Sequence, residues 1–345
     1  MRRQPSNGRG NRSRPPSART RARSSSPPGR PRPTTSPSRA RRAFRRDRGR
    51  HIVTAASEHK AVLDVLEALA FQGWEITRVA PESDGRVSPE TVAAALRADT
   101  VLVSIMHANN ETGVINDIDA IGAVAHDHGA LYHVDAAQTG GKLALDVGAQ
   151  AVDLVSLSAH KAYGPKGVGA LWVRRRPRVR LVPQMHGGGH ERGLRSGTLP
   201  THQVVGMGEA FALAQPRRTE DAAHAEALLA RLHAGLGDVE DLRENGDGAP
   251  RLPHIRSLAF GGVEGESLAA ALGDRVALAT GSACTTASLE PSFVLRAMGQ
   301  GHARAAEAVR LSWGRFTTAD EIDAAAAAIA DTVRRLRTAE RAAAG

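Results

Sequence analysis

Apolar residues recur along the chain in two alternating patterns from about His51 onward. Short runs rich in β-branched residues predict strands, and they are separated by longer stretches in which apolar residues recur at helical spacing. The predicted strands are 51–57, 74–80, 100–106, 131–137, 151–158 and 168–173, and the predicted helices are 59–73, 88–98 and 117–129. Strands that alternate with helices indicate βαβ units and a mostly parallel sheet covered on both faces, which is an α/β fold.

The pattern changes after about residue 200. A long Ala/Leu/Glu-rich helix over about 203–236 is followed by a strand at "IRSLAF", a helix at "GESLAAAL", an apolar run at "RVALAT" and a last helix over about 318–340. These elements predict a second, smaller α+β domain. We expect three regions: a disordered tail (1–50), a large domain (51–215) and a small C-terminal domain (216–345).

The charge of the chain is concentrated in its tail. Residues 1–50 hold 17 arginines and one acidic residue, Asp47, whereas the rest of the chain holds 29 basic and 35 acidic residues. The tail has too few apolar residues to form a core, which predicts disorder. Two explanations stay open: an RNA-binding arm, or an out-of-frame product of a GC-rich coding strand, since every basic residue there is Arg.

Composition excludes several classes of protein. The chain has one cysteine, which leaves no disulfide framework or cysteine-rich metal site and suits a reducing cytosol. No apolar run approaches the ~18 residues of a membrane span. We therefore expect a cytoplasmic protein without a membrane segment and without a bound metal.

Polar residues follow the apolar runs at four places: "SIMHANNETG", "YHVDAAQTGG", "SLSAHKAYGPKG" and "ATGSACTT". In open parallel sheets ligands bind at the carboxyl ends of strands. Lys161 at such an end could form a Schiff base with a carbonyl cofactor, or lie at the surface. Asp135 needs a cationic partner, which a pyridinium nitrogen or a structural ion pair would supply.

Several other residues keep two interpretations. His59 could stack on a flat cofactor or cap a helix, and Arg310, in a strand-like run, would seek a carboxylate if buried. Cys284 in "GSACTT" could be a thiolate nucleophile or a small buried side chain. Residues taken singly do not decide between these interpretations.

Taken together, the motifs are specific. "EHKAVLD", "VSIMHANNETG", "YHVDAAQTGGKL", "SAHKAYGPKGVGALWVRR", "QMHGGGHERGLRSGTLP", "VEGESL", "GSACTTASLEPS" and "LSWGRFTT" follow one another in this order. The chain from about His51 to Leu336 resembles the NifS/IscS-type cysteine desulfurases, which depend on pyridoxal 5'-phosphate (PLP). The resemblance implies an aminotransferase-like fold (fold type I), and the short "GSAC" loop points to the IscS-like branch.

The resemblance implies roles around the cofactor. Lys161 would hold PLP covalently and move the proton at Cα, and Asp135 would pair with the pyridinium nitrogen. His59 would stack on the ring and take part in catalysis. Asn110 and Gln138 would contact the oxygen side of the ring, and Asn110 would also contact the substrate.

It also implies how phosphate, substrate and sulfur are bound. Ser158 and His160 would bind the phosphate, joined by Thr198 from the other subunit of a homodimer. Arg310 would hold the carboxylate of L-cysteine. Cys284 would attack the substrate's sulfur, release L-alanine and keep a persulfide. An iron–sulfur scaffold protein and sulfur-relay proteins for tRNA thiolation would accept that sulfur.

The chain departs from the family at both ends. A folded segment that precedes "HIV" in family members, with a loop that cups the phosphate at a helix N-terminus, is replaced by the Arg-rich tail. The family's C-terminal tail, implicated in scaffold docking, is also absent. We therefore expect the chain as written to bind PLP weakly or not at all.

Three alternatives to an active desulfurase remain. The first is an inactive or frameshifted remnant of that enzyme, and the second is a selenocysteine lyase-like PLP enzyme. The third is an Arg-rich RNA-binding protein on a non-catalytic scaffold, in which nucleic acid would bind only through the tail.

Overall fold

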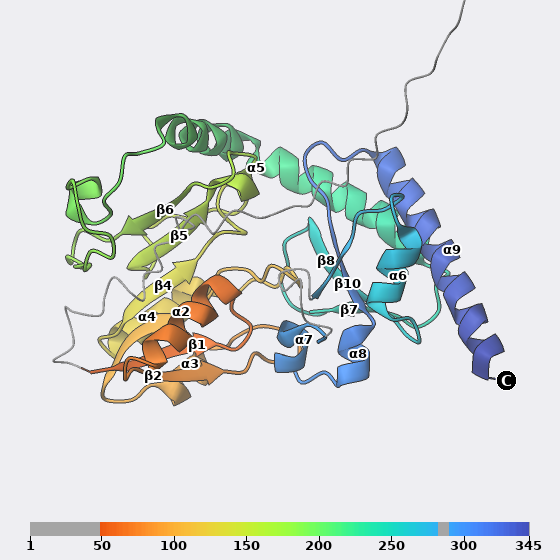
Figure 1. Cartoon of the computed structure of the whole chain (residues 1–345), viewed down its shortest axis with the longest axis horizontal. Coiled ribbons are helices and arrows are strands. Elements are labelled where there is room, and N and C mark those ends of the chain that lie inside the picture. The colour runs from red at the N-terminus through yellow and green to blue at the C-terminus, as the bar shows by residue number, and fades with distance from the viewer. Residues whose placement is uncertain (1–48, 282–289, 345) are drawn as a thin grey trace, which may run out of the picture. The chain divides into compact units, whose positions relative to one another are not determined.

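A six-stranded sheet forms the first half of the molecule (Figure 1). The computed structural model describes residues 49–281 and 290–344. The strands are β1 (His51–Ala55), β2 (Glu75–Val79), β3 (Thr100–Ser104), β4 (Leu131–Asp135), β5 (Leu154–Ser158) and β6 (Gly169–Val173). They lie in the order β2-β1-β3-β4-β5-β6, and every pair is parallel except β5 with β6. The predicted mostly parallel sheet is confirmed.

Helices α2 (Lys60–Ala70), α3 (Pro89–Ala95) and α4 (Ile118–Asp127) supply the apolar cover of this sheet. Successive strand side chains point to opposite faces. Ile52 of β1 accordingly packs in one buried cluster with Leu66 of α2, whereas Val53 packs in a second cluster with Val92 and Ile121 of α3 and α4. Both faces of the sheet are therefore buried, as the sequence predicts.

Local signals explain where these helices begin. The Ser88 hydroxyl accepts a hydrogen bond from the Thr91 backbone N–H at 3.2 Å, and Pro89 occupies the first turn of α3. α4 begins at Asp117, whose carboxylate accepts from the N–H groups of residues 119 and 120. These caps fix where α3 and α4 begin, and so where the loops that connect them to the preceding strands end.

A four-stranded antiparallel sheet forms the second half, in the order β7-β8-β10-β9. Its strands are β7 (Leu242–Asn245), β8 (Ile255–Phe260), β9 (Ala279–Thr280) and β10 (Ala308–Ser312), and its helices are α6 (Gly265–Leu272), α7 (Phe293–Ala297), α8 (His302–Ala306) and α9 (Ala319–Ala344). Leu232, Phe260 and Ile329 are fully buried in its core. The sequence analysis missed β7, α7 and α8, and only the last two residues of "RVALAT" form a strand.

Helix α5 (Thr201–Leu236) joins the two sheets and contains Pro216. Its C-terminal half is buried against α9 through residues such as Leu228 and Leu232, while its N-terminal half exposes Val205. The domain boundary that we predicted at residue 215 falls inside this helix and stays a prediction. No helix within residues 49–281 and 290–344 is long and apolar enough to cross a membrane.

Candidate functional site

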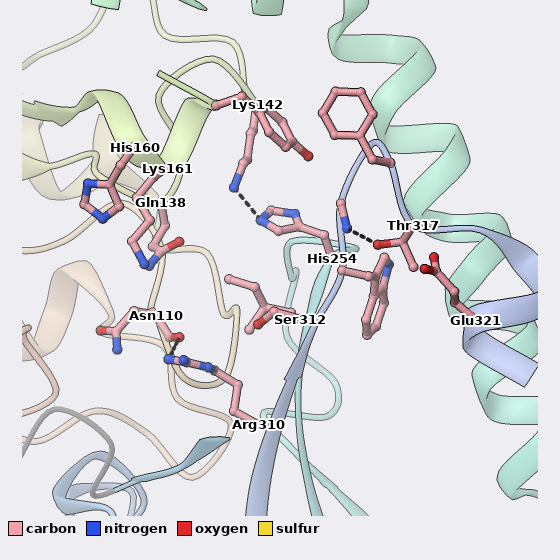
Figure 2. A pocket seen from close by; sticks show the side chains of 15 residues that line it. Asn110, Gln138, Lys142, His160, Lys161, His254, Arg310, Ser312, Thr317 and Glu321 are labelled. Atoms are coloured by element: carbon pink, nitrogen blue, oxygen red, sulfur yellow. Dashed lines mark hydrogen bonds between the residues drawn. The ribbon is translucent and has the colours of Figure 1, made fainter. Parts of the chain in front are cut away.

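A cavity of about 540 Å³ brings together five of the predicted site residues (Figure 2). Asn110, Gln138, His160 and Lys161 reach it from loops at the carboxyl ends of β3, β4 and β5, and Arg310 reaches it from β10. This is the edge at which open α/β sheets bind ligands. Residues up to 200 positions apart in the chain therefore line one site, as expected.

Of the three predicted phosphate ligands, His160 lines the cavity, whereas Ser158 and Thr198 do not. The Ser158 hydroxyl and His160 Nδ1 are 2.8 Å apart and share a hydrogen bond, and His160 is exposed. Thr198 is exposed and is not among the residues that line the cavity. Cys284 lies outside the described residues, so its predicted role as a nucleophile stays a prediction.

Asp135 is the last residue of β4 and carries a carboxylate in an apolar setting. Its Oδ1 accepts a hydrogen bond from the Ala137 N–H at 2.9 Å. Burial raises the pKa of this carboxyl, while the Ala137 N–H and then the nearby His59 and Lys161 lower it in part. A further cation beside Asp135 would favour its ionised form, which is what a pyridinium nitrogen would do.

His59 occupies the helix-capping position that we had left open as its alternative role. Its Nδ1 accepts the Ala61 N–H at 3.1 Å at the start of α2. A ring nitrogen that accepts carries no proton, so the proton of a neutral His59 is on Nε2. The cap thus fixes the orientation of the ring and does not exclude a second role for its Nε2 edge.

The residues present fit PLP. A volume of about 540 Å³ lies within the range typical of small-molecule sites. Lys161 supplies an amine at the cavity wall, and Asp135 supplies a carboxylate that needs a cation. In the part of the chain that the structure describes, no group of three His, Cys, Asp or Glu residues could hold a metal ion.

Arg310 is partly buried, and its charge acts on the nearby carboxyl of Glu111. Its Nη1 donates to the Asn110 carbonyl oxygen at 3.1 Å. Burial raises the pKa of Glu111, and the Ser292 hydroxyl and then the Arg310 charge lower it in part. The guanidinium is held at the cavity wall by a backbone carbonyl, which leaves further N–H groups for a ligand.

Lys142 and His254 also line the cavity, and the sequence analysis did not single them out. Lys142 Nζ lies 2.8 Å from His254 Nε2. Burial, with the charge of Lys161, lowers the pKa of Lys142 to about 8, and burial lowers that of His254 to about 3. Lys142 follows the same strand end as Gln138 in "YHVDAAQTGGKL", and this proximity was the signal available in the sequence.

Glu58 is a second residue that sequence reasoning missed. It is fully buried, its Oε1 accepts the Met106 N–H, and its Oε2 has no hydrogen-bond partner among the described residues. Burial, and then the charge of Asp135, raise the pKa of Glu58 well above its ordinary value. Burial and the nearby Asp135 therefore both favour the neutral form of the Glu58 carboxyl.

Replacing Glu58 with glutamine should make the protein more stable at neutral pH. A raised pKa in the folded state means that stability is present below the unfolded-state pKa and is lost as pH rises. Above about pH 4.5 the wild type should lose about 1.4 kcal/mol per pH unit relative to Glu58→Gln, until the folded-state pKa is reached. Urea unfolding at pH 5, 6 and 7 measures this difference.

The matched control is Glu67→Gln, which changes an exposed carboxylate on α2. Its unfolding free energy should run parallel to that of the wild type across the same pH range. A Glu58→Gln curve that also ran parallel would contradict the burial of a neutral acid at this position.

Comparisons with known proteins agree with this geometry. Residues 37–325 match the model of the class-V aminotransferase family. The cysteine desulfurase IscS of Azotobacter vinelandii is 53% identical over 294 residues, which are 85% of this chain and 72% of that protein.

Two solved structures share the fold and carry related names. A NifS-like protein superposes with a TM-score of 0.77 at 33% identity, covering 87% of this chain and 78% of its own. SspA, solved in complex with cysteine, superposes with a TM-score of 0.70 at 34% identity, covering 81% and 78%. The chain therefore belongs to the class-V aminotransferase family and, within it, to the PLP-dependent cysteine desulfurases of the IscS type.

Proposed function

We propose that this chain converts L-cysteine to L-alanine and takes the sulfur onto Cys284 as a persulfide. The observation that carries the proposal is the cavity that Lys161 and Arg310 line together, with the buried carboxylate of Asp135 close enough to Lys161 for their charges to interact. A Schiff-base lysine, a carboxylate-binding guanidinium and a carboxylate for a pyridinium are the groups that this chemistry needs. The membership of the IscS type and the SspA complex with cysteine support the same substrate.

The residues would hold the cofactor and substrate as follows. Lys161 holds PLP covalently, Asp135 pairs with its ring nitrogen, and Gln138 contacts the ring oxygen. When bound, PLP supplies an electron sink for the charge that develops at the substrate Cα. Ser158 and His160, already joined by a hydrogen bond, bind the phosphate.

The substrate is oriented by its carboxylate. Arg310 binds that carboxylate through the N–H groups that its bond to the Asn110 carbonyl leaves over. Asn110 contacts the cofactor and substrate from the same loop. Lys161 takes the proton from Cα and returns it, and the capped His59 contributes to proton transfer through its Nε2 edge.

Sulfur transfer would occur at Cys284. Its thiolate attacks the substrate sulfur, an S–S bond forms, and the C–S bond breaks. The bonding electrons stay with the carbon fragment, which takes up a proton and leaves as L-alanine. The transferred sulfur remains as a persulfide, so the step needs no external oxidant or reductant.

A homodimer would complete the site. The N-terminal half of α5 exposes Val204, Val205 and Leu213, with exposed fractions of 45, 64 and 48%. Leu194 and Leu199, in the loop that carries Thr198, are also exposed. A second copy packed against these exposed apolar residues would bury them and bring its own Thr198 to the phosphate.

The sulfur acceptors that we propose are an iron–sulfur scaffold protein and the sulfur-relay proteins of tRNA thiolation, in the cytosol. The alternative functions predict different products. A selenocysteine lyase would release alanine from selenocysteine and leave Cys284 unmodified. An inactive remnant would bind PLP or L-cysteine without forming alanine.

Product analysis tests the proposal. The protein is incubated with excess PLP and L-cysteine without added dithiothreitol, and L-alanine is quantified. Because the chain has one cysteine, we expect a burst of about one alanine per chain, then a slower phase limited by transfer of the persulfide sulfur to the substrate thiol, which dithiothreitol should accelerate. Bound PLP with no alanine would sink the proposal in favour of an inactive protein.

A further inference from the structure

Lys142 is a cation in the cavity that the proposed chemistry does not use. It lines the same cavity as Lys161 and Arg310, and Figure 2 shows its amine directed toward His254. A buried ammonium is costly unless an anion compensates it. An anion close to Lys142 is therefore needed to compensate its positive charge.

The described residues provide no carboxylate for this role. The charged groups that face Lys142 are Lys161 from the loop after β5 and Asp221 from α5. Asp221 is already held by the guanidinium of Arg315, with Nε at 2.8 Å from Oδ1 and Nη2 bonded to Oδ2. The compensating anion must therefore come largely from a ligand.

His254 holds Lys142 in place without adding a charge. Its ring is surrounded by the cations Lys142, Arg256 and Lys161, and its pKa of about 3 keeps it neutral at physiological pH. A neutral ring with an unprotonated Nε2 accepts one N–H of the ammonium at 2.8 Å. Two N–H groups of Lys142 then remain for a ligand in the cavity.

We propose that Lys142, held by His254, binds the side-chain thiolate of the substrate while Arg310 binds its carboxylate. The inference rests on the proposed function, since L-cysteine has one polar group beyond its carboxylate and amine. As the S–H bond breaks, the thiol proton goes to solvent where Lys142 is already an ammonium, and to the Lys142 amine at a pH where that amine is neutral. The products of that transfer, a thiolate and an ammonium, stay paired in the cavity.

The acid strengths of the two groups support the transfer. A free thiol has a pKa of about 8.5, and that of Lys142 is about 8. Nearly equal values make the transfer cost little in either direction, and the ion pair is favoured once water is excluded. A substrate hydroxyl, whose pKa lies far above that of Lys142, would not give up its proton. Lys142 thus selects sulfur over oxygen.

Binding of 3-mercaptopropionate to the holoenzyme tests the inference without turnover, because this ligand has the carboxylate and thiol but no amine. Calorimetry in buffers of different ionisation enthalpy counts the protons exchanged. At pH 7 the wild type should release about one proton, because Lys142 is already an ammonium. At pH 9.5 it should exchange almost none, because the thiol, still largely protonated in a ligand without an amine, gives its proton to a neutral Lys142.

Two substitutions separate the charge from the proton. Lys142→Met should weaken binding of 3-mercaptopropionate at least about tenfold and abolish proton release at pH 7. Lys142→Arg should keep the affinity and the release at pH 7 and should also release protons at pH 9.5, because arginine stays charged and cannot accept the thiol proton. The matched control Lys166→Met, at an exposed lysine outside the cavity lining, should behave as the wild type.

The hydroxyl analogue 3-hydroxypropionate should bind equally to wild type and Lys142→Met. Equal affinity of 3-mercaptopropionate for these two proteins, or no proton release by the wild type at pH 7, would overturn the inference. These outcomes are read from binding alone. If the protein forms alanine but fails this binding test, the proposed function stands and the thiolate subsite is wrong. If it passes the binding test but forms no alanine, the thiolate subsite stands and the proposed function is wrong.

Discussion

Replacing Lys161 with alanine should abolish covalent attachment of PLP and slow alanine formation at least about a thousandfold. Lys161 lies in the short helix η1 (Ala159–Ala162) directly after β5, where it lines the cavity. Its charge also lowers the pKa of Asp135, which lies beside it at the end of β4. One side chain therefore provides the attachment point, the proton carrier and part of the local positive charge.

The visible absorption of lysine-bound PLP and the rate of alanine formation measure the loss. Lys161→Arg serves as a second variant, because it keeps the positive charge but cannot form the covalent link, and it should be as inactive as Lys161→Ala. Lys166→Ala removes an exposed lysine of the same loop and should keep both signals. A visible band that survived in Lys161→Ala would show that another amine holds the cofactor.

Replacing Cys284 with serine should eliminate the persulfide and reduce alanine formation from L-cysteine to background. A hydroxyl is a far weaker nucleophile toward sulfur than a thiolate is. The chain contains no second cysteine that could substitute. The effect should therefore be a complete loss of protein-bound sulfur, while the PLP absorption of the variant stays that of the wild type.

Mass spectrometry after alkylation measures the persulfide on the intact chain. Wild-type protein treated with iodoacetamide before L-cysteine is added gives the matched control, because only one thiol is available to react. Like Cys284→Ser, it should gain no further mass when L-cysteine is added and should form no alanine above background. If Cys284→Ser formed alanine at the wild-type rate, the persulfide mechanism would be wrong, and the protein would be a lyase that forms no persulfide.

The long elements of the fold could be predicted from the sequence because their patterns extend over many residues. Helices α5 and α9 were predicted within a few residues of their bounds. β7 was missed because "LREN" is short and mostly polar and becomes a strand only by pairing with β8. The antiparallel direction of β6 could not be read from "VGALWV", since the apolar pattern of a strand is the same in both directions.

Site residues that directly follow a strand could be predicted from the sequence. Residues whose role depends on burial could not. Gln138 and Lys161 lie at the carboxyl ends of β4 and β5, as the motifs indicate. Glu58 and Lys142 lie inside the motifs "EHKAVLD" and "YHVDAAQTGGKL", but only the fold removes them from water and shifts their pKa values. The sequence shows which side chains can ionise, whereas their burial in the fold decides how far their pKa values shift.

The bond from Arg310 to the Asn110 carbonyl joins residues 200 positions apart. A contact between residues so far apart in the sequence closes a very long loop. The conformational entropy lost on closing it must be offset by other native contacts. Neither sheet alone can make it, because β3 leads to Asn110 and β10 carries Arg310. The catalytic cavity is thus assembled only when both halves of the chain have folded, so a nascent chain still lacking β10 has no place to bind L-cysteine.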